Sequence, residues 1–446
     1  SRKTVRRTHN RYLRNSRYPM TRARFTRLDI LGLACLAWAA SGGEIAWGLV
    51  GERLAGVDPP RVEWSVLIEP VRRAPIQEPQ TLVAPSGQEN RAYAPFASGW
   101  QFLQGELCPL EEGLFADAAD GRWDEHALLG AALVASGVVD RDLLLNYQMQ
   151  VAWLADELKQ SGKMTGPPRQ KAQALFEFLH RRVLVGGYRL DSTSLTLALD
   201  EGRYNCVSAS VLFNCLAARF GLSAGGLEIP GHAMSRLALP DGTLNVETTC
   251  PGWFRLMDDP RKQAELVERT LGLRPGGGNA SGEPREVTDV ELVATIYYNR
   301  GVDLLGEKRF AEAVAANAKA LRLDLASTTA RGNLLATLNN WAIDLDTAGR
   351  HAEAIELLRR GIALDPEYET FRVNYVHVHF QWIEELCREN RFGEALDLIA
   401  RALKDRVEEA RFREVRLDVS RCWARSHPEP PATGRVGGAS LGISGK

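Results

Sequence analysis

The feature that most constrains the fold is a pattern that returns at a fixed interval in the C-terminal third of the chain. Its three copies begin 41 residues apart and read RFAEA, RHAEA and RFGEA, at residues 309–313, 350–354 and 391–395. Each copy follows an amphipathic segment with helical spacing and opens a second one. The second segment carries a small residue, which lets two helices approach closely, at Ala320, Gly361 and Ala402. The pattern predicts stacked helical hairpins over residues 291–426.

Hairpins with this pattern resemble the tetratricopeptide repeat, whose usual period is about 34 residues. The longer period predicts helices about one turn longer each, or longer loops. A helical bundle without repeat order is the alternative. The resemblance implies a solenoid that binds a protein partner, without saying which one.

The sequence of residues 202–221 predicts a buried helix whose first turn carries a candidate nucleophile, Cys206. Asn205 is a suitable N-cap, an apolar run follows it, and Gly221 ends the helix. Cys206 then lies on the first turn, where free backbone N–H groups and the helix dipole favour a thiolate and can hold an oxyanion. Tyr204 and Asn205 are candidates for the oxyanion side, although the cap alone explains Asn205. A buried structural cysteine is the alternative.

A strand and its hairpin partner follow this helix. Residues 227–237 read LEIPGHAMSRL, a strand entered through a Pro-Gly turn, and the return strand covers residues 243–248. Strand alternation puts Asn245 and Glu247 on one face, so we expect His232 near one of these two groups. A thiol, an imidazole and a group that orients the imidazole are what nucleophilic catalysis by sulfur needs.

Several short motifs between about residues 165 and 260 resemble the bacterial transglutaminase-like superfamily. They are Gly202-x-x-x-Cys206, Leu216-Ala217-x-x-Phe220-Gly221-Leu222, Pro230-x-His232 and a hairpin that carries an acid. The resemblance implies a papain-like core with Cys206 as nucleophile, His232 as general base and Glu247 as orienting residue. The family usually has Asp in the third place. Asn245 is therefore kept as the alternative orienting residue.

The expected fold is α+β, a papain/transglutaminase-like core of helices packed on a small antiparallel sheet, followed by an all-α tetratricopeptide-like solenoid. Trp253 is a candidate wall of the cleft. The expected parts are a basic segment with a signal peptide or membrane anchor (1–50), a Pro-rich linker (51–109), the transglutaminase-like domain (110–272), a flexible linker (273–290), the repeats (291–426) and a disordered tail (427–446).

The N-terminal segment has the pattern of an export signal. Residues 1–27 carry ten Lys or Arg and no acid, and the apolar run 30–40 ends in Ala37-Trp38-Ala39. An uncleaved membrane anchor over residues 28–50 is the alternative, because the apolar run continues weakly to Val50, although Glu44 lies within it and roughly 20 apolar residues are needed to cross a bilayer. We therefore expect export to the periplasm or cell envelope.

The net charge and the spacing of the cysteines indicate which ligands the chain is not expected to bind. The net charge of −1 gives no indication of nucleic-acid binding. The seven cysteines show no CxxC or CxxH spacing, so neither a metal site nor another cofactor is expected.

These observations predict an exported thiol-dependent acyl-transfer enzyme that acts on a protein or peptide substrate. Hydrolysis by a peptidase or amidase and protein cross-linking share the same first step, a thioester on Cys206, so the triad does not separate them. The rival is a non-catalytic scaffold, in which a degenerate cysteine domain and the repeats mediate protein–protein interaction.

Overall fold

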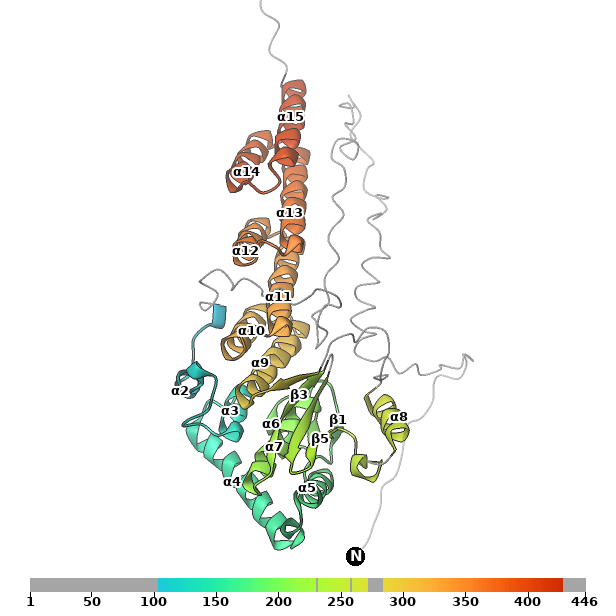
Figure 1. Ribbon diagram of the computed structural model, residues 1–446. Helices are drawn as coiled ribbons and strands as arrows, with labels where there is room; N and C mark the ends of the chain where they lie inside the picture. The colour runs from blue at the N-terminus through green and yellow to red at the C-terminus, as the bar shows by residue number, and fades with distance from the viewer. Residues whose placement is uncertain (1–102, 230–231, 257–258, 272–283, 428–446) are drawn as a thin grey trace, which may run out of the picture. The chain divides into compact units, whose positions relative to one another are not determined.

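The computed structural model describes residues 103–229, 232–256, 259–271 and 284–427 (Figure 1). The expected basic segment with its signal or anchor, most of the Pro-rich linker and the tail beyond residue 427 lie outside the described residues. None of the helices formed by the described ranges combines the length and hydrophobicity needed to span a bilayer. The described chain is mostly helical, with two small sheets.

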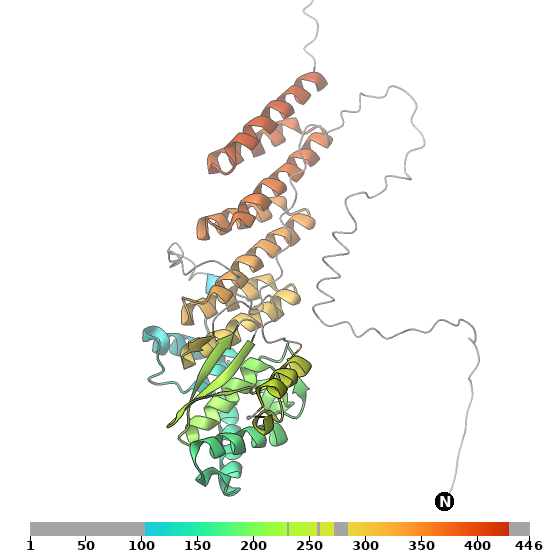
Figure 2. The same cartoon turned by 45° about the vertical axis from the view of Figure 1, so that its right-hand side comes forward.

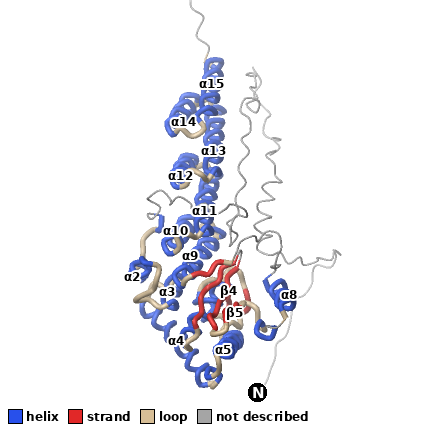
Figure 3. Tube along the Cα trace, viewed as in Figure 1, coloured by secondary structure: helices blue, strands red, loops and turns tan. Residues whose placement is uncertain are grey.

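The first part of the described chain surrounds a small sheet with helices. Its helices are α2 (Pro109–Asp117), α3 (Leu128–Ala135), α4 (Arg141–Gln160), α5 (Pro168–Arg182), α6 (Leu195–Asp200), α7 (Cys206–Arg219) and α8 (Pro260–Leu271), with 3-10 turns η3 (Ala118–Asp120), η4 (Lys163–Thr165) and η5 (Trp253–Leu256). Its strands are β1 (Gly187–Tyr188), β2 (Arg203–Tyr204), β3 (Ser223–Ile229), β4 (His232–Leu239), β5 (Gly242–Val246) and β6 (Arg285–Val287). Strands β1 and β2 are parallel, and the antiparallel sheet has the order β5-β4-β3-β6. Figure 3 shows strands in this part of the chain and only helices beyond it.

Helix α7 is enclosed on all sides. Residues 206–217 are all buried, between β3 and β4 on one side and α3, α5 and α9 on others. Its small and apolar side chains allow such close approach, because a helix without a polar face belongs in the core. This packing fixes the position of the α7 N-terminus, where Cys206 lies.

The prediction of a flexible linker over residues 273–290 is wrong for its last part. Residues 285–287 form β6, which pairs antiparallel with β3, and α9 begins at Asp289 with Thr288 as its N-cap. The Gly- and Pro-rich stretch 272–283 lies outside the described residues. A three-residue edge strand is too short to show alternation in the sequence, and pairing with β3 stabilises it.

Residues 289–426 form successive helical hairpins. The first helices are α9 (Asp289–Gly306), α11 (Thr328–Thr347), α13 (Glu369–Arg388) and α15 (Glu409–Ser426), and the second helices are α10 (Phe310–Leu323), α12 (His351–Leu364) and α14 (Phe392–Asp405). Helices α11 and α13 have 20 residues each, and α10, α12 and α14 have 14. Two short turns complete the 41-residue period. Figure 2 shows the hairpins stacked in chain order.

Aromatic pairs join one hairpin to the next. Trp341 stacks on Phe310 with 6.2 Å between ring centroids, and Trp382 stacks on His351 at 5.8 Å, one period later. These pairs were missed in the sequence, although the tryptophans have the same 41-residue spacing. The small residue at position 361 is also explained, because a Cβ there would lie 2.8 Å from ring atoms of Phe371 in α13.

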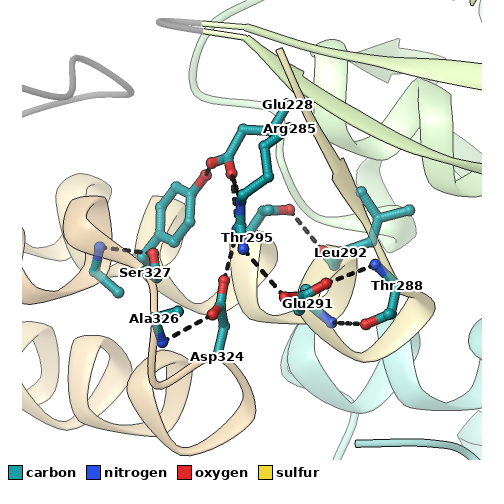
Figure 4. Close-up of polar contacts among 11 residues, drawn as sticks. Glu228, Arg285, Thr288, Glu291, Leu292, Thr295, Asp324, Ala326 and Ser327 are labelled. Carbon is teal, nitrogen blue, oxygen red and sulfur yellow. Dashed lines mark hydrogen bonds and ion pairs between the residues drawn. The ribbon is translucent and has the colours of Figure 1, made fainter. Parts of the chain in front are cut away.

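An ion cluster joins the sheet to the repeats (Figure 4). Arg285 on β6 contacts three acids, Glu228 on β3 at 2.8 Å, Asp324 after α10 at 2.7 Å and Glu291 in α9 at 3.1 Å. The Tyr298 hydroxyl of α9 donates to Glu228 at 3.0 Å. Helix α9 also packs against α3 and α7. The first repeat and the sheet-containing part therefore share a core.

Candidate active site

Helix α7 begins at Cys206 with Asn205 as its N-cap, as the sequence predicts. The side-chain oxygen of Asn205 accepts hydrogen bonds from the N–H groups of Val207 (2.9 Å) and Ser208 (3.1 Å). Its amide donates to the Thr193 hydroxyl at 2.6 Å and to a backbone carbonyl, so the side chain is committed to the cap. The Cys206 N–H has no hydrogen-bond partner among the described residues. Such an unpaired N–H is the donor that an oxyanion hole needs.

His232 and Glu247 meet at the end of the β4–β5 hairpin. The distance between His232 Nε2 and Glu247 Oε2 is 2.6 Å, and the two side chains are 1% and 0% exposed. Glu247 Oε1 accepts hydrogen bonds from the Thr249 N–H at 3.0 Å and from the Thr249 hydroxyl. Both oxygens of this buried carboxylate are therefore satisfied, which offsets the cost of burying its charge.

The His232 ring lies between an acid and a thiol. Burial lowers its pKa, but the charges of Glu247 and Cys206, and hydrogen bonds to both, raise the pKa to about 10. Because Nε2 is bound to Glu247, Nδ1 is the ring nitrogen left for the thiol. Nδ1 is buried and has no partner of standard hydrogen-bond geometry within the described ranges, so the contact with the thiol is longer or less well aligned than that with the carboxylate. The two neighbours therefore favour the protonated, positively charged form of the ring.

Asn245, the alternative orienting residue, lies outside this cluster. Strand β5 ends at Val246, so the alternation expected to place Asn245 and Glu247 on one face does not extend to Glu247. Asn245 is exposed, pairs with Arg236 in the β4–β5 register and accepts a hydrogen bond from Arg236 Nε at 2.8 Å. The glutamate is therefore the group that contacts His232.

The two aromatic residues expected in the cleft have different surroundings. Tyr204 is 3% exposed, and its hydroxyl donates at 3.4 Å to the carbonyl of Thr249, the residue that also bonds Glu247. Burial, and then nearby negative charge, raises the pKa of Tyr204 to about 12. Trp253 is half-buried, and its indole N–H donates to the Asn245 carbonyl at 3.2 Å, which places it beside β5.

Tyr188 belongs to the cluster, and sequence analysis missed it. It pairs with Tyr204 in the β1–β2 register, and the two rings meet edge to face at 6.2 Å. Burial raises its pKa above the usual range, and the charges of Cys206 and Glu247 add to this effect, so the phenol lies near both. Strand β1 has only two residues, too few for a periodic signal. The glycine pair at 186–187 was the local hint of a tight approach.

His180 on α5 borders the cluster and was also missed. Burial lowers its pKa to about 4, partly offset by a hydrogen bond to the Thr248 backbone and by the charge of Glu247. Its ring meets Tyr204 edge-on at 5.9 Å. Burial therefore favours the neutral form of His180, whereas His232 contacts Glu247 directly.

A thiol, an imidazole and a carboxylate in series are the groups that acyl transfer through sulfur uses. In the part of the chain that the structure describes, no three His, Cys, Asp or Glu side chains are placed together to hold a metal ion.

The fold and the site define a class of protein, a small-sheet domain with a buried Cys-His-Glu cluster joined to a helical repeat array. A family model described as tetratricopeptide repeat matches residues 292–367, which extend from α9 to the turn after α12. These residues are tetratricopeptide repeats, and the same 41-residue period continues through α13 and α14. No transglutaminase-like domain is detected. No curated protein and no solved structure matches the chain.

Proposed function

We propose that the chain is a thiol-dependent acyl-transfer enzyme whose cysteine domain has a papain-like, transglutaminase-like core. The observation that carries the proposal is the 2.6 Å hydrogen bond between His232 and Glu247, beside a thiol at the start of α7. A histidine whose pKa is raised to about 10 by a carboxylate and a thiol is the kind of perturbed group that clusters at active sites.

In the proposed reaction the Cys206 sulfur attacks the carbonyl carbon of an amide. The C–S bond forms while the carbonyl oxygen takes up negative charge, which the Cys206 N–H stabilises. The C–N bond then breaks, and His232 gives its proton to the leaving amine, so that a thioester remains. Water or a second amine attacks the thioester carbonyl and His232 takes up a proton from it, after which the C–S bond breaks, the acyl product leaves and the Cys206 thiolate is restored. Glu247 orients the ring and keeps it charged in the resting enzyme. Attack by water is hydrolysis, and attack by an amine is cross-linking.

We expect iodoacetamide to alkylate Cys206 at pH 6 faster than it alkylates an ordinary thiol. An unperturbed thiol is less than about 1% ionised at that pH, whereas an adjacent imidazolium favours the thiolate. Brief labelling of the folded chain followed by peptide mapping identifies the modified residue. Cys108 is the internal control, because it is the one described cysteine that is not fully buried. Labelling of Cys108 at the same or a higher rate than Cys206 would contradict the proposal.

The repeats supply the protein-binding part of the function. Tetratricopeptide repeats mediate protein–protein interaction, and this assignment covers residues 292–367 directly. We propose that the array recruits a protein or peptide substrate to the cysteine domain. The shared core around α9 supports this, because a partner held on the repeats is then held at a defined position relative to α7.

A non-catalytic scaffold is the second candidate, and the burial of the nucleophile favours it. Cys206 is only 4% exposed, so an incoming amide needs an opening of the cluster before it can reach the sulfur. In this case the cysteine domain serves as a folded support and the repeats carry the whole function. Slow labelling of Cys206, combined with capture of a protein partner by the repeats, is the result that this candidate requires.

We also propose export to the cell envelope, supported by the basic residues 1–27 and the apolar run 30–40. Residues 1–50 fused to alkaline phosphatase, which becomes active only after export, are expected to give an active fusion. Replacing Leu33 and Leu36 by Arg is expected to abolish that activity, because the apolar run is then interrupted. Membrane and soluble fractions of the active fusion separate an anchor from a cleaved signal. An active double-Arg fusion would refute the proposal.

A further inference from the structure

The three repeat copies differ at one set of equivalent positions. These positions lie 41 residues apart, one on the first helix and two on the second helix of each copy. The residues are Tyr297, Lys319 and Arg322 in the first copy, Leu338, Arg360 and Ala363 in the second, and His379, Arg401 and Lys404 in the third. The first and third copies therefore carry two cations beside a ring, and the second does not.

In the first copy this set holds a segment of the chain itself, helix α2. Both carboxylate oxygens of Glu111 lie 2.8 Å from Lys319 Nζ, and the carboxylate also accepts a hydrogen bond from the Tyr297 hydroxyl at 3.1 Å. The Phe115 ring stacks on Tyr297 at 5.9 Å and lies 4.6 Å from the Arg322 guanidinium. Glu111 is 7% exposed and Phe115 is 2% exposed. One acid and one aromatic ring, four residues apart on a helix, thus fill the site.

In the second copy the set is incomplete. Arg360 is engaged by Glu356 of its own helix at 2.8 Å, and the remaining two positions are apolar. Among the described residues, the second copy therefore lacks the pair of cations that receives α2 in the first.

In the third copy the set is complete and its two cations are open to solvent, while the His379 ring is 2% exposed and bonds the Tyr375 carbonyl at 2.8 Å. Arg401 and Lys404 are exposed, and neither has an ion-pair or hydrogen-bond partner among the described residues. They border a groove of about 390 Å³ between α12 and α14, with α13 as its floor. The apolar lining is formed by Ile355, Trp382 and Leu398.

The acids of this groove are already engaged. Glu356 pairs with Arg359 and Arg360, each at 2.8 Å. Asp405 accepts a hydrogen bond from the Tyr375 hydroxyl at 2.7 Å. Asp405 keeps its charge, but the two cations Arg401 and Lys404 outweigh it, so the groove has a net positive charge that complements an acidic ligand.

We propose that the groove between α12 and α14 binds a short acidic helix of a partner protein. A carboxylate of the partner contacts Arg401 and Lys404, and an aromatic or aliphatic side chain one turn away packs against Trp382. In the first copy, Glu111 of α2 likewise pairs with Lys319, and Phe115 lies over Arg322. This inference rests on the proposed role of the repeats in recruiting a protein, and it names the chemistry of that partner. It is independent of the chemistry at Cys206.

The test uses the full chain and a labelled peptide that copies residues 107–119, with Cys108 replaced by Ser. In the folded protein the first copy already holds its own α2, so the third copy is the site left for the peptide. Fluorescence anisotropy is expected to show saturable binding below about 1 mM. Each of the variants Arg401→Glu and Lys404→Glu is expected to weaken peptide binding by about tenfold or more, because a charge-assisted contact is lost and a repulsion is added. Lys308→Glu, the same charge change at an exposed site in the first hairpin, is the matched control and is expected to bind as wild type does.

Two peptide variants test the ligand side. Glu111→Gln and Phe115→Ala peptides are expected to bind about tenfold more weakly, whereas a Glu112→Gln peptide binds as the parent does. The proposal is overturned if no peptide binds, or if Arg401→Glu and Lys404→Glu bind as tightly as wild type. Cys206 labelling is measured on the same samples, so failure of the groove and failure of the catalytic thiol are scored separately. Circular dichroism of each variant confirms that these exposed substitutions leave the fold intact.

Discussion

Replacement of His232 by Ala is expected to slow the alkylation of Cys206 by about 100-fold at pH 6.5. An ordinary thiol is about 1% ionised at that pH, so removal of the imidazolium that favours the thiolate lowers the reactive fraction to roughly that level. The measurement is the second-order rate constant for iodoacetamide, with the modified peptide identified by mass spectrometry.

The pH profile separates an electrostatic role of His232 from a structural one. The pKa of His232 is raised to about 10, above the ordinary value of 6.5, so the ring stays charged as the pH rises until it approaches 10. The imidazolium that favours the thiolate therefore persists over this range, and the wild-type rate is expected to change less with pH than the His232→Ala rate does. In His232→Ala the rate is expected to rise about tenfold per pH unit until the thiol ionises as an ordinary thiol does, near pH 8.5.

Two further variants extend this test, one as a control and one as a second change to the cluster. Asn245→Ala is expected to label as wild type does, because Asn245 bonds Arg236 on the exposed face of the sheet. Glu247→Gln is expected to slow labelling by about tenfold or more, since the negative charge that favours the imidazolium is removed. Equal labelling of His232→Ala and wild type across this pH range would leave the cluster without a catalytic role.

Replacement of Arg285 by Met is expected to lower the free energy of unfolding by about 2–3 kcal/mol. Loss of one partner from a fully buried ion pair costs roughly 3–5 kcal/mol, and the lower value applies because the Arg285 side chain is 38% exposed. The cost arises because Glu228 and Asp324, 16% and 4% exposed, lose their cation. Urea denaturation followed by circular dichroism measures the change. The β3–β6 edge and the first repeat are expected to unfold together in both proteins.

The matched control for Arg285 is Arg350→Ala. Arg350 pairs with Glu353 on the surface, where both side chains are more than half exposed, so its loss is expected to cost less than about 0.5 kcal/mol. If Arg285→Met also lowers the free energy of unfolding by less than about 0.5 kcal/mol, the cluster in Figure 4 does not stabilise the junction between sheet and repeats.

The sequence predicted correctly those helices that are specified by residues close together in the chain. The 41-residue spacing predicted the helical hairpins, and the Asn205 cap with the apolar run behind it predicted a helix that begins at Cys206. Both predictions are confirmed, because capping and helical periodicity depend on residues within a few positions of each other. The tryptophan pairs had the same period and could have been found in the same way.

The end of strand β5 decides which side chain forms the hydrogen bond with His232. The sequence left Glu247 and Asn245 both open, because alternation treats them as equivalent. Strand β5 ends at Val246, so Glu247 leaves the strand pattern and turns inward to His232 and Thr249. Tyr188 likewise reaches the cluster through a two-residue strand, which carries no periodic signal of its own.

By itself the sequence determined the repeat period, the position of the thiol on its helix and the residue types of the candidate site, since these are properties of neighbours along the chain. Only the tertiary structure decided that the acid is Glu247, that residues 285–287 form an edge strand within an expected linker, and that α2 fills the first repeat while the third stays open. These features depend on contacts between residues far apart in the chain, such as the 208 positions between Glu111 and Lys319, and no local pattern encodes them.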